Sequence, residues 1–253
     1  MVTEAARITY VGHATVLIEM DGARLLTDPV LRRRVGPLRR HGPAPDPLLT
    51  EGVDAILISH LHHDHADAPS LRRLSRAVPV FASPGAGGFL ENLGFGDVRE
   101  LAPGESGSVG DVRVTATEAN HPTGGRRFER TAQAVGFDLT GRRRIYFAGD
   151  TDLFDGMEGI GDGIDLALLP IWGWGTSIGA GHLDPERAAR AAALLSPRAV
   201  VPIHWGTLYP LGLARFRPEP LRSPPREFAA WMRALAPQVE ARVLAPGEAT
   251  SLS

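Results

Sequence analysis

Four histidines and one aspartate follow directly on an apolar stretch near residue 60. Residues 56–67 read ILISHLHHDHAD. The apolar residues are typical of a buried strand, whereas imidazole nitrogens and carboxylate oxygens are the ligands that a dication such as zinc prefers. His60 and His62 alternate on an extended backbone, and Asp64 and His65 can turn toward a neighbouring point as the chain curls. A histidine-rich polar turn is the alternative, but the spacing favours a metal site.

Three further ligand-type residues occupy the same kind of position elsewhere in the chain. Each of His121, Asp150 and His204 follows an apolar run within a few residues. A ligand at the end of a strand is firmly held and still accessible at the edge of the sheet. Taken alone, His121 or His204 would be interpreted as an ordinary histidine. The repeated placement, together with the first cluster, favours a shared metal site.

The elements that would position these residues are short strands with helices between them. We predict strands at 7–10, 15–20, 24–27, 56–58, 80–82, 98–101, 112–117, 133–139, 144–148, 166–169, 199–203 and 241–244. We predict helices at 68–77, 85–93, 185–195 and 225–235, and a long irregular loop at 29–50. Asp184 is suited to cap the third helix, with Pro185 in its first turn. This order favours sheets covered by helices on their outer faces.

The motifs, in this order, resemble the metallo-β-lactamase superfamily over nearly the whole chain. The matching residues are HLHHDH at 60–65, His121, GDTD at 149–152 and His204. GHAT (12–15), LLTDPV (25–30), DLALLP (165–170) and GHLDPERA (181–188) are similar to one branch, which contains N-acylphosphatidylethanolamine phospholipase D-like and ascorbate-6-phosphate lactonase-like hydrolases. The resemblance implies an α/β fold, a four-layer αβ/βα sandwich of two mixed β-sheets flanked by helices. The metals would lie at one edge, between the sheets.

The resemblance also implies a ligand set and a chemistry. The expected ligands are His60, His62 and His121 for one divalent ion, Asp64, His65 and His204 for the other, and Asp150 as a bridge between them. Zinc is the expected metal, with manganese or iron as alternatives that also suit nitrogen and oxygen ligands. Two such ions can share a water, lower its pKa and present hydroxide to a phosphoryl or carbonyl group. His63 fills a variable position of the motif and is expected to point elsewhere.

Four residues of the expected site have further roles. Asp64 is expected to orient the hydroxide as well as to bind metal. The resemblance implies that His182 faces the metals, contacts substrate, and gives a proton to the leaving group or stabilises an oxyanion. Asp28 would fix the ligand loop, or else be an ordinary turn residue. The resemblance places His13 near the mouth of the site, with a packing role as the alternative.

Substrate contacts are expected from the irregular segments. Trp172 and Trp174, between glycines, could form an apolar wall for the substrate or else contact the core or a second copy of the chain. Arg126-Arg127 and the Arg32–Arg40 segment could receive a phosphate, although a solvated basic surface is the favoured alternative. Loop 29–50 is long for a compact domain, which suggests that it shapes the mouth of the site.

Composition narrows the class of protein. We expect one domain over residues 1–253. The formal net charge of −2, with no basic stripe, argues against nucleic acid as a partner. The absence of cysteine excludes disulfides and thiolate ligands, and it argues against β-lactam hydrolysis, because some true β-lactamases use a cysteine ligand. The N-terminal residues show no basic leader and no run of about 18 apolar residues occurs, so we expect a cytoplasmic protein without integral membrane association. A homo-oligomer is left open.

The functional hypothesis is a dinuclear metal-dependent hydrolase of a small-molecule substrate. The substrate would be a small phosphodiester, a phosphorylated lactone or a related ester, and a metal-bridging hydroxide would attack it. The alternatives are a nuclease of the same superfamily and a di-iron redox protein. A binding protein on a degenerate hydrolase fold is disfavoured because all seven expected ligands are present.

Overall fold

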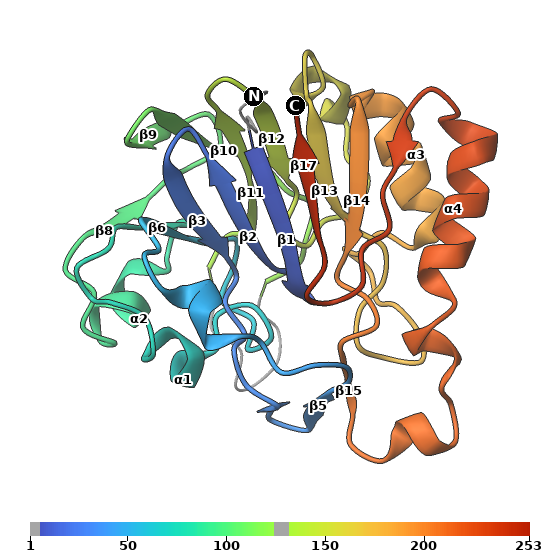
Figure 1. Ribbon diagram of the computed structural model, residues 1–253, viewed down its shortest axis with the longest axis horizontal. Coiled ribbons are helices and arrows are strands. Elements are labelled where there is room, and N and C mark those ends of the chain that lie inside the picture. Colours follow the sequence, from blue (N-terminus) through green and yellow to red (C-terminus); the bar gives the residue numbers. More distant parts are fainter. Residues whose placement is uncertain (1–5, 124–131) are drawn as a thin grey trace.

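Two large β-sheets lie face to face in the computed structural model, which describes residues 6–123 and 132–253. The strands of the first sheet, in spatial order, are β17 (Ala249–Leu252), β1 (Ala6–Gly12), β2 (Thr15–Met20), β3 (Ala23–Thr27), β6 (Ala55–Ile58), β7 (Val80–Ala82) and β8 (Val98–Glu100). Those of the second are β16 (Glu240–Ala241), β14 (Ala199–Ile203), β13 (Leu166–Pro170), β12 (Arg144–Phe147), β11 (Val135–Thr140), β10 (Val112–Glu118) and β9 (Ser106–Val109). Each sheet has antiparallel and parallel pairs, so both are mixed as expected (Figure 1).

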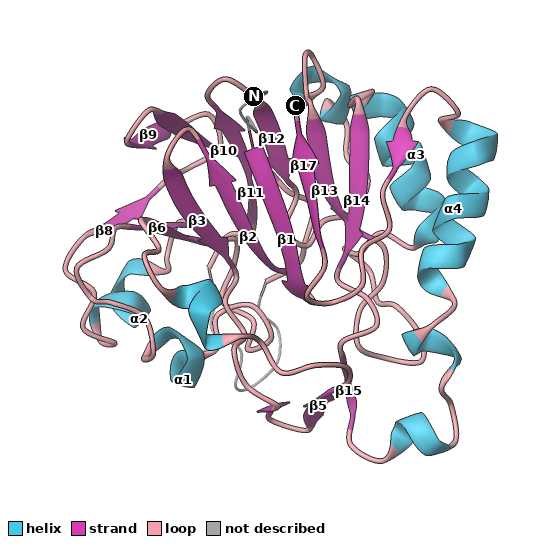
Figure 2. Cartoon of the chain, in the orientation of Figure 1, coloured by secondary structure: helices cyan, strands magenta, loops and turns pink. Residues whose placement is uncertain are grey.

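Helices cover the outer face of each sheet (Figure 2). The helices α1 (Ala68–Leu71) and α2 (Gly87–Glu91) lie against the first sheet, while α3 (Pro185–Leu195) and α4 (Pro224–Leu235) lie against the second. Single 3₁₀ turns occupy η1 (Pro47–Thr50), η2 (Met157–Ile160), η3 (Leu213–Arg215) and η4 (Glu219–Leu221). The fold is therefore an αβ/βα sandwich. No helix in the described part of the chain is long and apolar enough to cross a membrane.

Strand residues alternate between two cores because successive side chains point to opposite faces. On β6, Leu57 joins the core between the sheets, whereas Ile56 and Ile58 join the core under the helices of the first sheet. Both faces of β6 are thus buried, which explains its unbroken apolar sequence. The first histidine cluster begins immediately after this strand, so its backbone starts from a rigid and fully packed support.

The third predicted helix forms as its sequence indicates. The Asp184 carboxylate accepts a hydrogen bond from the backbone N–H of Arg187 at 2.8 Å, and Pro185 occupies the first turn. Ala188 and Ala192 are fully buried and pack against the second sheet. Small side chains let this helix approach the sheet closely, which places residue 182 beside the ends of the strands.

The helix predicted at 68–77 and the strand predicted at 241–244 differ from the structure. The helix predicted at 68–77 ends at Leu71, because the Arg76 guanidinium donates to the carbonyls of Leu71 and Leu74 and turns the chain. The last strand was predicted at 241–244, but β16 covers only Glu240–Ala241, and the weakly apolar β17 pairs with β1.

Loop 29–50 contains more order than its sequence indicated. Its strands β4 (Arg34–Val35) and β5 (Leu38–Arg40) form a small third sheet with β15 (Leu208–Pro210). The buried Val35, Leu38 and Leu208 form its core, which draws together segments about 170 residues apart in sequence. In the view of Figure 1 this sheet lies below the two large ones, at the edge where several strands end.

Candidate metal centre

Side chains of both large sheets converge at one edge of the sandwich. Residues 60–65 follow β6 in the first sheet, whereas His121, Asp150 and His204 follow β10, β12 and β14 in the second. The structure therefore brings together all the residues that the sequence predicted as ligands, in two neighbouring groups. Each of these two groups draws residues from both sheets.

The first group consists of His60, His62 and His121, whose candidate ligand atoms lie within 4.8 Å of one another. His62 Nδ1 is 3.1 Å from His121 Nε2. His121 Nδ1 donates to the Gly181 carbonyl at 2.8 Å, which fixes the tautomer and leaves Nε2 with its lone pair. His60 is fully buried, and its Nε2 has no hydrogen-bond partner among the described residues. An unpartnered buried nitrogen of this kind suits a metal ligand.

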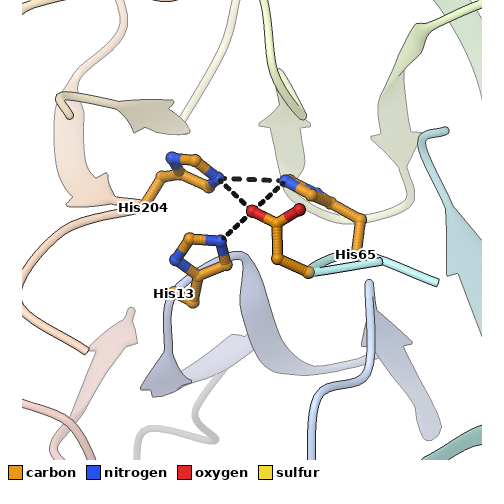
Figure 3. A group of neighbouring side chains, drawn as sticks. His13, His65 and His204 are labelled. Carbon is orange, nitrogen blue, oxygen red and sulfur yellow. Dashed lines mark hydrogen bonds and ion pairs between the residues drawn. The ribbon is translucent and has the colours of Figure 1, made fainter. Parts of the chain in front are cut away.

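The second group consists of Asp64, His65 and His204, with His13 beside them (Figure 3). His65 Nε2 lies 3.0 Å from His204 Nε2, and Asp64 Oδ2 lies 3.8 Å from each of these nitrogens. His204 Nδ1 donates to the Trp172 carbonyl at 2.8 Å, so the neutral ring directs the lone pair of Nε2 at His65.

Asp150 lies between the two groups. Its Oδ2 is 3.1 Å from His65 Nε2, its Oδ1 is 3.2 Å from His204 Nε2, and it also belongs to a cluster with His121. The carboxylate is 2% exposed. The preceding Gly149 has φ +62°, and a Cβ there would lie 2.7 Å from the Cβ of Ser59. Only glycine allows the chain to bring Asp150 this close to the ligand loop.

Asp28 supports the ligand loop from below. Its carboxylate accepts hydrogen bonds from the Ser59 backbone N–H at 2.8 Å and the Ser59 hydroxyl at 2.6 Å, and it lies 2.7 Å from His65 Nδ1. From the sequence, Asp28 would either fix the ligand loop or be an ordinary turn residue. The structure places it in contact with His65, a predicted ligand. Its carboxylate orients the His65 ring, as partners of metal-binding histidines generally do.

The charges of the centre favour bound cations. Burial alone would raise the pKa of Asp150, but His204 and His65 hold it well below its usual value. Burial also lowers the pKa values of His60 and His204, which keeps both rings neutral. Burial opposes protonation of His65 as well, yet Asp150 and Asp28 raise its pKa well above the usual value.

These residues fit divalent metal ions. Ionised carboxylates, and neutral imidazoles whose lone pairs point into the centre, attract positive charge. Without a positive charge between them, lone pairs on His65 Nε2 and His204 Nε2, which lie 3.0 Å apart, would repel each other. The positive charge can come from a proton on His65 or from cations among the ligand atoms. Nitrogen and carboxylate donors without a thiolate suit zinc, manganese and iron.

His182 lies on the open side of Asp150. Its Nε2 is 3.4 Å from Asp150 Oδ2, and its side chain is 23% exposed. Burial would lower the pKa of His182, but Asp150 outweighs burial and raises it. The side chain faces the ligand groups from the solvent side, where the sequence predicted it, and its catalytic role stays a prediction.

His13 lies deeper than the sequence indicated. It was expected near the mouth of the site, but it is fully buried, with Nε2 2.9 Å from Asp64 Oδ2. The GHAT motif at 12–15 was the feature of the sequence that pointed to a role for His13. It could not reveal the contact, because Asp64 is 51 residues away in the chain.

A cavity of about 960 Å³ opens onto the ligand groups. We call its walls the rim, which consists of Arg32, residues 35–38 and 173–179, Pro210 and Leu213, and we call the two ligand groups with Asp150 the floor. Most rim side chains are apolar, among them Leu38, Trp174 and Leu213. Part of loop 29–50 thus shapes the mouth of the site, as the sequence predicted.

The two tryptophans have different positions. Trp174 lines the cavity and is 36% exposed. Trp172 does not line it; its indole N–H donates to the Gly175 carbonyl and its own carbonyl accepts from His204. His63 lies apart from the ligand groups, as expected, but it points into the cavity.

Two arginines of the segment that could receive a phosphate, Arg32 and Arg40, are already engaged, whereas Arg33 and Arg39 are exposed on the surface. Arg32 lines the cavity, but its guanidinium forms two hydrogen bonds with Asp67, at 2.7 and 2.8 Å. Arg40 is buried and donates to backbone carbonyls, including that of Val11, and burial lowers its pKa to about 10. Arg126-Arg127 lie outside the described residues.

Comparisons with known proteins agree on one family. Residues 23–205 match the family described as Beta-lactamase superfamily domain. A metal-dependent hydrolase from Rubrobacter xylanophilus is 35% identical, with 96% of this chain and 95% of the relative covered. An N-acyl-phosphatidylethanolamine-hydrolyzing phospholipase D of Caenorhabditis elegans is 31% identical, with 84% of this chain and 67% of the relative covered.

Longer relatives and a solved structure complete the comparison. An uncharacterised protein of Mycobacterium tuberculosis is 33% identical, and the match covers 86% of this chain but only 61% of that protein. The solved structure of Igni18, a metallo hydrolase from Ignicoccus hospitalis, superimposes with a TM-score of 0.74 at 26% identity, with 98% of both chains covered.

Proposed function

The chain belongs to the β-lactamase superfamily, and from that premise we propose that it is a hydrolase that depends on two divalent metal ions. The proposed ligands are His60, His62 and His121 for one ion, Asp64, His65 and His204 for the other, and Asp150 for both. One observation carries the proposal. Each group has its ligand atoms within 4.8 Å of one another, and the buried Asp150 carboxylate contacts histidines of the second group and clusters with His121 of the first. Zinc is the proposed metal, with manganese or iron as alternatives.

The side chains around the centre have distinct tasks in this proposal. Bound divalent ions would lower the pKa of a water toward neutrality and stabilise negative charge on a phosphoryl or carbonyl oxygen. Asp64 and Asp150 stay ionised beside their histidines, so they can hold cations and orient a nucleophilic water. His182 faces the same point from the open side and is positioned to donate a proton to the leaving group.

The cavity supports an ester with an apolar or planar portion. Leu38, Trp174 and Leu213 offer apolar contact, while the reacting group would lie near the floor. The one arginine among the described lining residues, Arg32, is paired with Asp67, so recognition of an anionic group falls to the metal centre and His182. We therefore propose a small phosphodiester, a phosphorylated lactone or a related ester. The C. elegans relative is named for a phosphodiester substrate, which favours the first of these.

The alternatives have less support. A nuclease would need a basic surface along the strand, whereas the chain carries a net charge of −2 and the described rim is mostly apolar. A di-iron redox protein would use the same nitrogen and oxygen ligands, so metal content and reaction type must separate it from a hydrolase.

Metal analysis of the purified chain, paired with a screen of chromogenic phosphodiesters, lactones and thioesters, tests the proposal. We expect about two ions per chain, and hydrolysis of at least one substrate class that a chelator abolishes and added zinc or manganese restores. Chelator-resistant hydrolysis, or fewer than two ions bound at saturation, would contradict the dinuclear assignment. Iron with a redox activity and no hydrolysis would favour the di-iron alternative.

A further inference from the structure

His13 is a buried histidine in the metal centre to which the proposed function gives no task. It lies in the turn between β1 and β2 and is fully buried. Its Nε2 is 2.9 Å from Asp64 Oδ2, and its ring lies on that of His204, with centroids 3.8 Å apart (Figure 3). The side chain therefore contacts two proposed ligands of the second ion.

The backbone of His13 is held in a demanding conformation. Its φ of +59° lies in the left-handed region, which costs a residue with a Cβ about 1 kcal/mol or more. Its N–H donates to the Thr207 hydroxyl at 3.1 Å, and its carbonyl accepts from the His204 N–H at 2.8 Å. These bonds join a turn of the first sheet to the segment after β14 in the second. Together they fix where the ring of His13 lies.

The direction of the hydrogen bond between His13 and Asp64 follows from the chemistry of the carboxylate. An ionised carboxylate can only accept, so Nε2 of His13 carries the proton, and Nδ1 has no hydrogen-bond partner among the described residues. The accepting Oδ2 is also the oxygen that lies 3.8 Å from the Nε2 atoms of His65 and His204. One lone pair of Oδ2 faces His13, and another remains for the space between these two rings.

We propose that His13 is a positioning residue: its Nε2–H holds the Asp64 carboxylate in the orientation that the second metal ion requires. The inference rests on the proposed metal centre. Two other roles are distinct from it. In the first, His13 only packs against His204. In the second, His13 binds the ion directly, since its ring nitrogen lies within 4.8 Å of the other ligand atoms.

Two substitutions separate the three roles. His13→Gln keeps an N–H donor at about the reach of Nε2, whereas His13→Phe keeps the ring against His204 and removes the donor. We expect His13→Phe to lower the affinity for the second ion by about 10- to 100-fold, the usual effect of losing such a partner. His13→Gln should stay within a few-fold of wild type, and the affinity for the first ion should not change in either variant. Zinc titration in metal-buffered solution measures both affinities without any substrate.

Each remaining outcome contradicts the inference. Wild-type affinity in His13→Phe would show that the ring only packs, and equal losses in both variants would show that His13 is a direct ligand. Circular dichroism of the metal-free proteins checks folding; if His13→Phe does not fold, His13→Met, which matches glutamine in length, replaces it. If the wild-type chain binds fewer than two ions, the proposed metal centre is wrong. If the wild-type chain binds two ions and the variant without the donor keeps wild-type affinity for the second ion, only this inference is wrong.

Discussion

The floor and the rim of the cavity are held in place by different means. On the floor, the rings of His65, His121 and His204 are each oriented by a hydrogen bond to a carboxylate or a backbone carbonyl. On the rim, Trp174 is 36% exposed and lies in a loop between glycines. Pre-oriented groups suit chemistry that needs fixed geometry, whereas an exposed loop such as that of Trp174 can vary with the substrate. We infer that the floor determines the reaction and the rim determines the substrate.

The two regions meet at both ends of one rim segment. The carbonyl of Trp172 holds His204, and the carbonyl of Gly181 holds His121. These residues flank the rim segment 173–179. One end of that segment therefore orients His204 of the second group, and the other end orients His121 of the first group. Changes in the middle of the segment should therefore alter binding, and changes at its ends should alter the floor.

The largest effect is expected on the floor, at Asp150. Asp150→Ala removes the carboxylate that contacts His65 and His204, so hydrolysis should fall to background and at least one metal ion per chain should be lost. Elemental analysis and initial rates measure both. Asp152→Ala is the matched control, because Asp152 belongs to the same motif but pairs with Arg187. If the Asp150→Ala variant keeps its full metal content and normal turnover, Asp150 does not bridge the two ions.

His182 lies where the floor opens to the rim, and its effect should be smaller. His182→Ala should lower kcat by about 10²- to 10⁴-fold, the usual range for a group that transfers a proton, with metal content unchanged. Steady-state kinetics and elemental analysis test this. His63→Ala is the control, because His63 also faces the cavity but lies outside the ligand groups. Loss of a metal equivalent in His182→Ala would mean that His182 is a ligand.

The rim itself should affect binding more than turnover. Trp174→Ala should raise KM about 10-fold for a phosphodiester with an apolar portion, because the substrate loses an apolar contact there, and it should spare a small generic phosphodiester. In Trp172→Ala the carbonyl that holds His204 remains, so any change should be similar for both substrates. Comparing KM and kcat for the two substrates in each variant makes the distinction. Equal effects of Trp174→Ala on both substrates would show that Trp174 only supports the fold.

The smallest effect is expected at Arg32, although it lines the cavity. Its guanidinium is committed to Asp67, so Arg32→Ala should change KM for an anionic substrate by less than about 3-fold. The free energy of unfolding in urea should fall by about 1–3 kcal/mol, because only Arg32 is partly exposed and its loss leaves the buried Asp67 carboxylate without its charged partner. A tenfold rise in KM without loss of stability would mean that Arg32 leaves Asp67 to bind substrate, and that the rim does recognise charge.

The sequence predicted the floor better than the rim, for a physical reason. Spacing after β6 and placement at strand ends depend on local backbone geometry, so the candidate ligands and the cap of α3 could be singled out from neighbours in the chain, while the ligand set itself was implied by the family resemblance. The small third sheet could not, because β5 pairs with β15 far along the chain. The contact of His13 with Asp64, and the different roles of Trp172 and Trp174, also depend on such distant contacts.

Because each ligand group draws side chains from both sheets, metal availability would act on the lifetime of the protein as well as on its activity. His60, His62, Asp64 and His65 follow a strand of the first sheet, whereas His121, Asp150 and His204 follow strands of the second. An ion that binds only when the sheets are packed together adds its binding free energy to the stability of the sandwich, and the gain rises with the free ion concentration. Newly made chains in metal-starved cells would then open at this edge more often and reach proteases sooner. Abundance would report metal supply before any change in catalysis was measured.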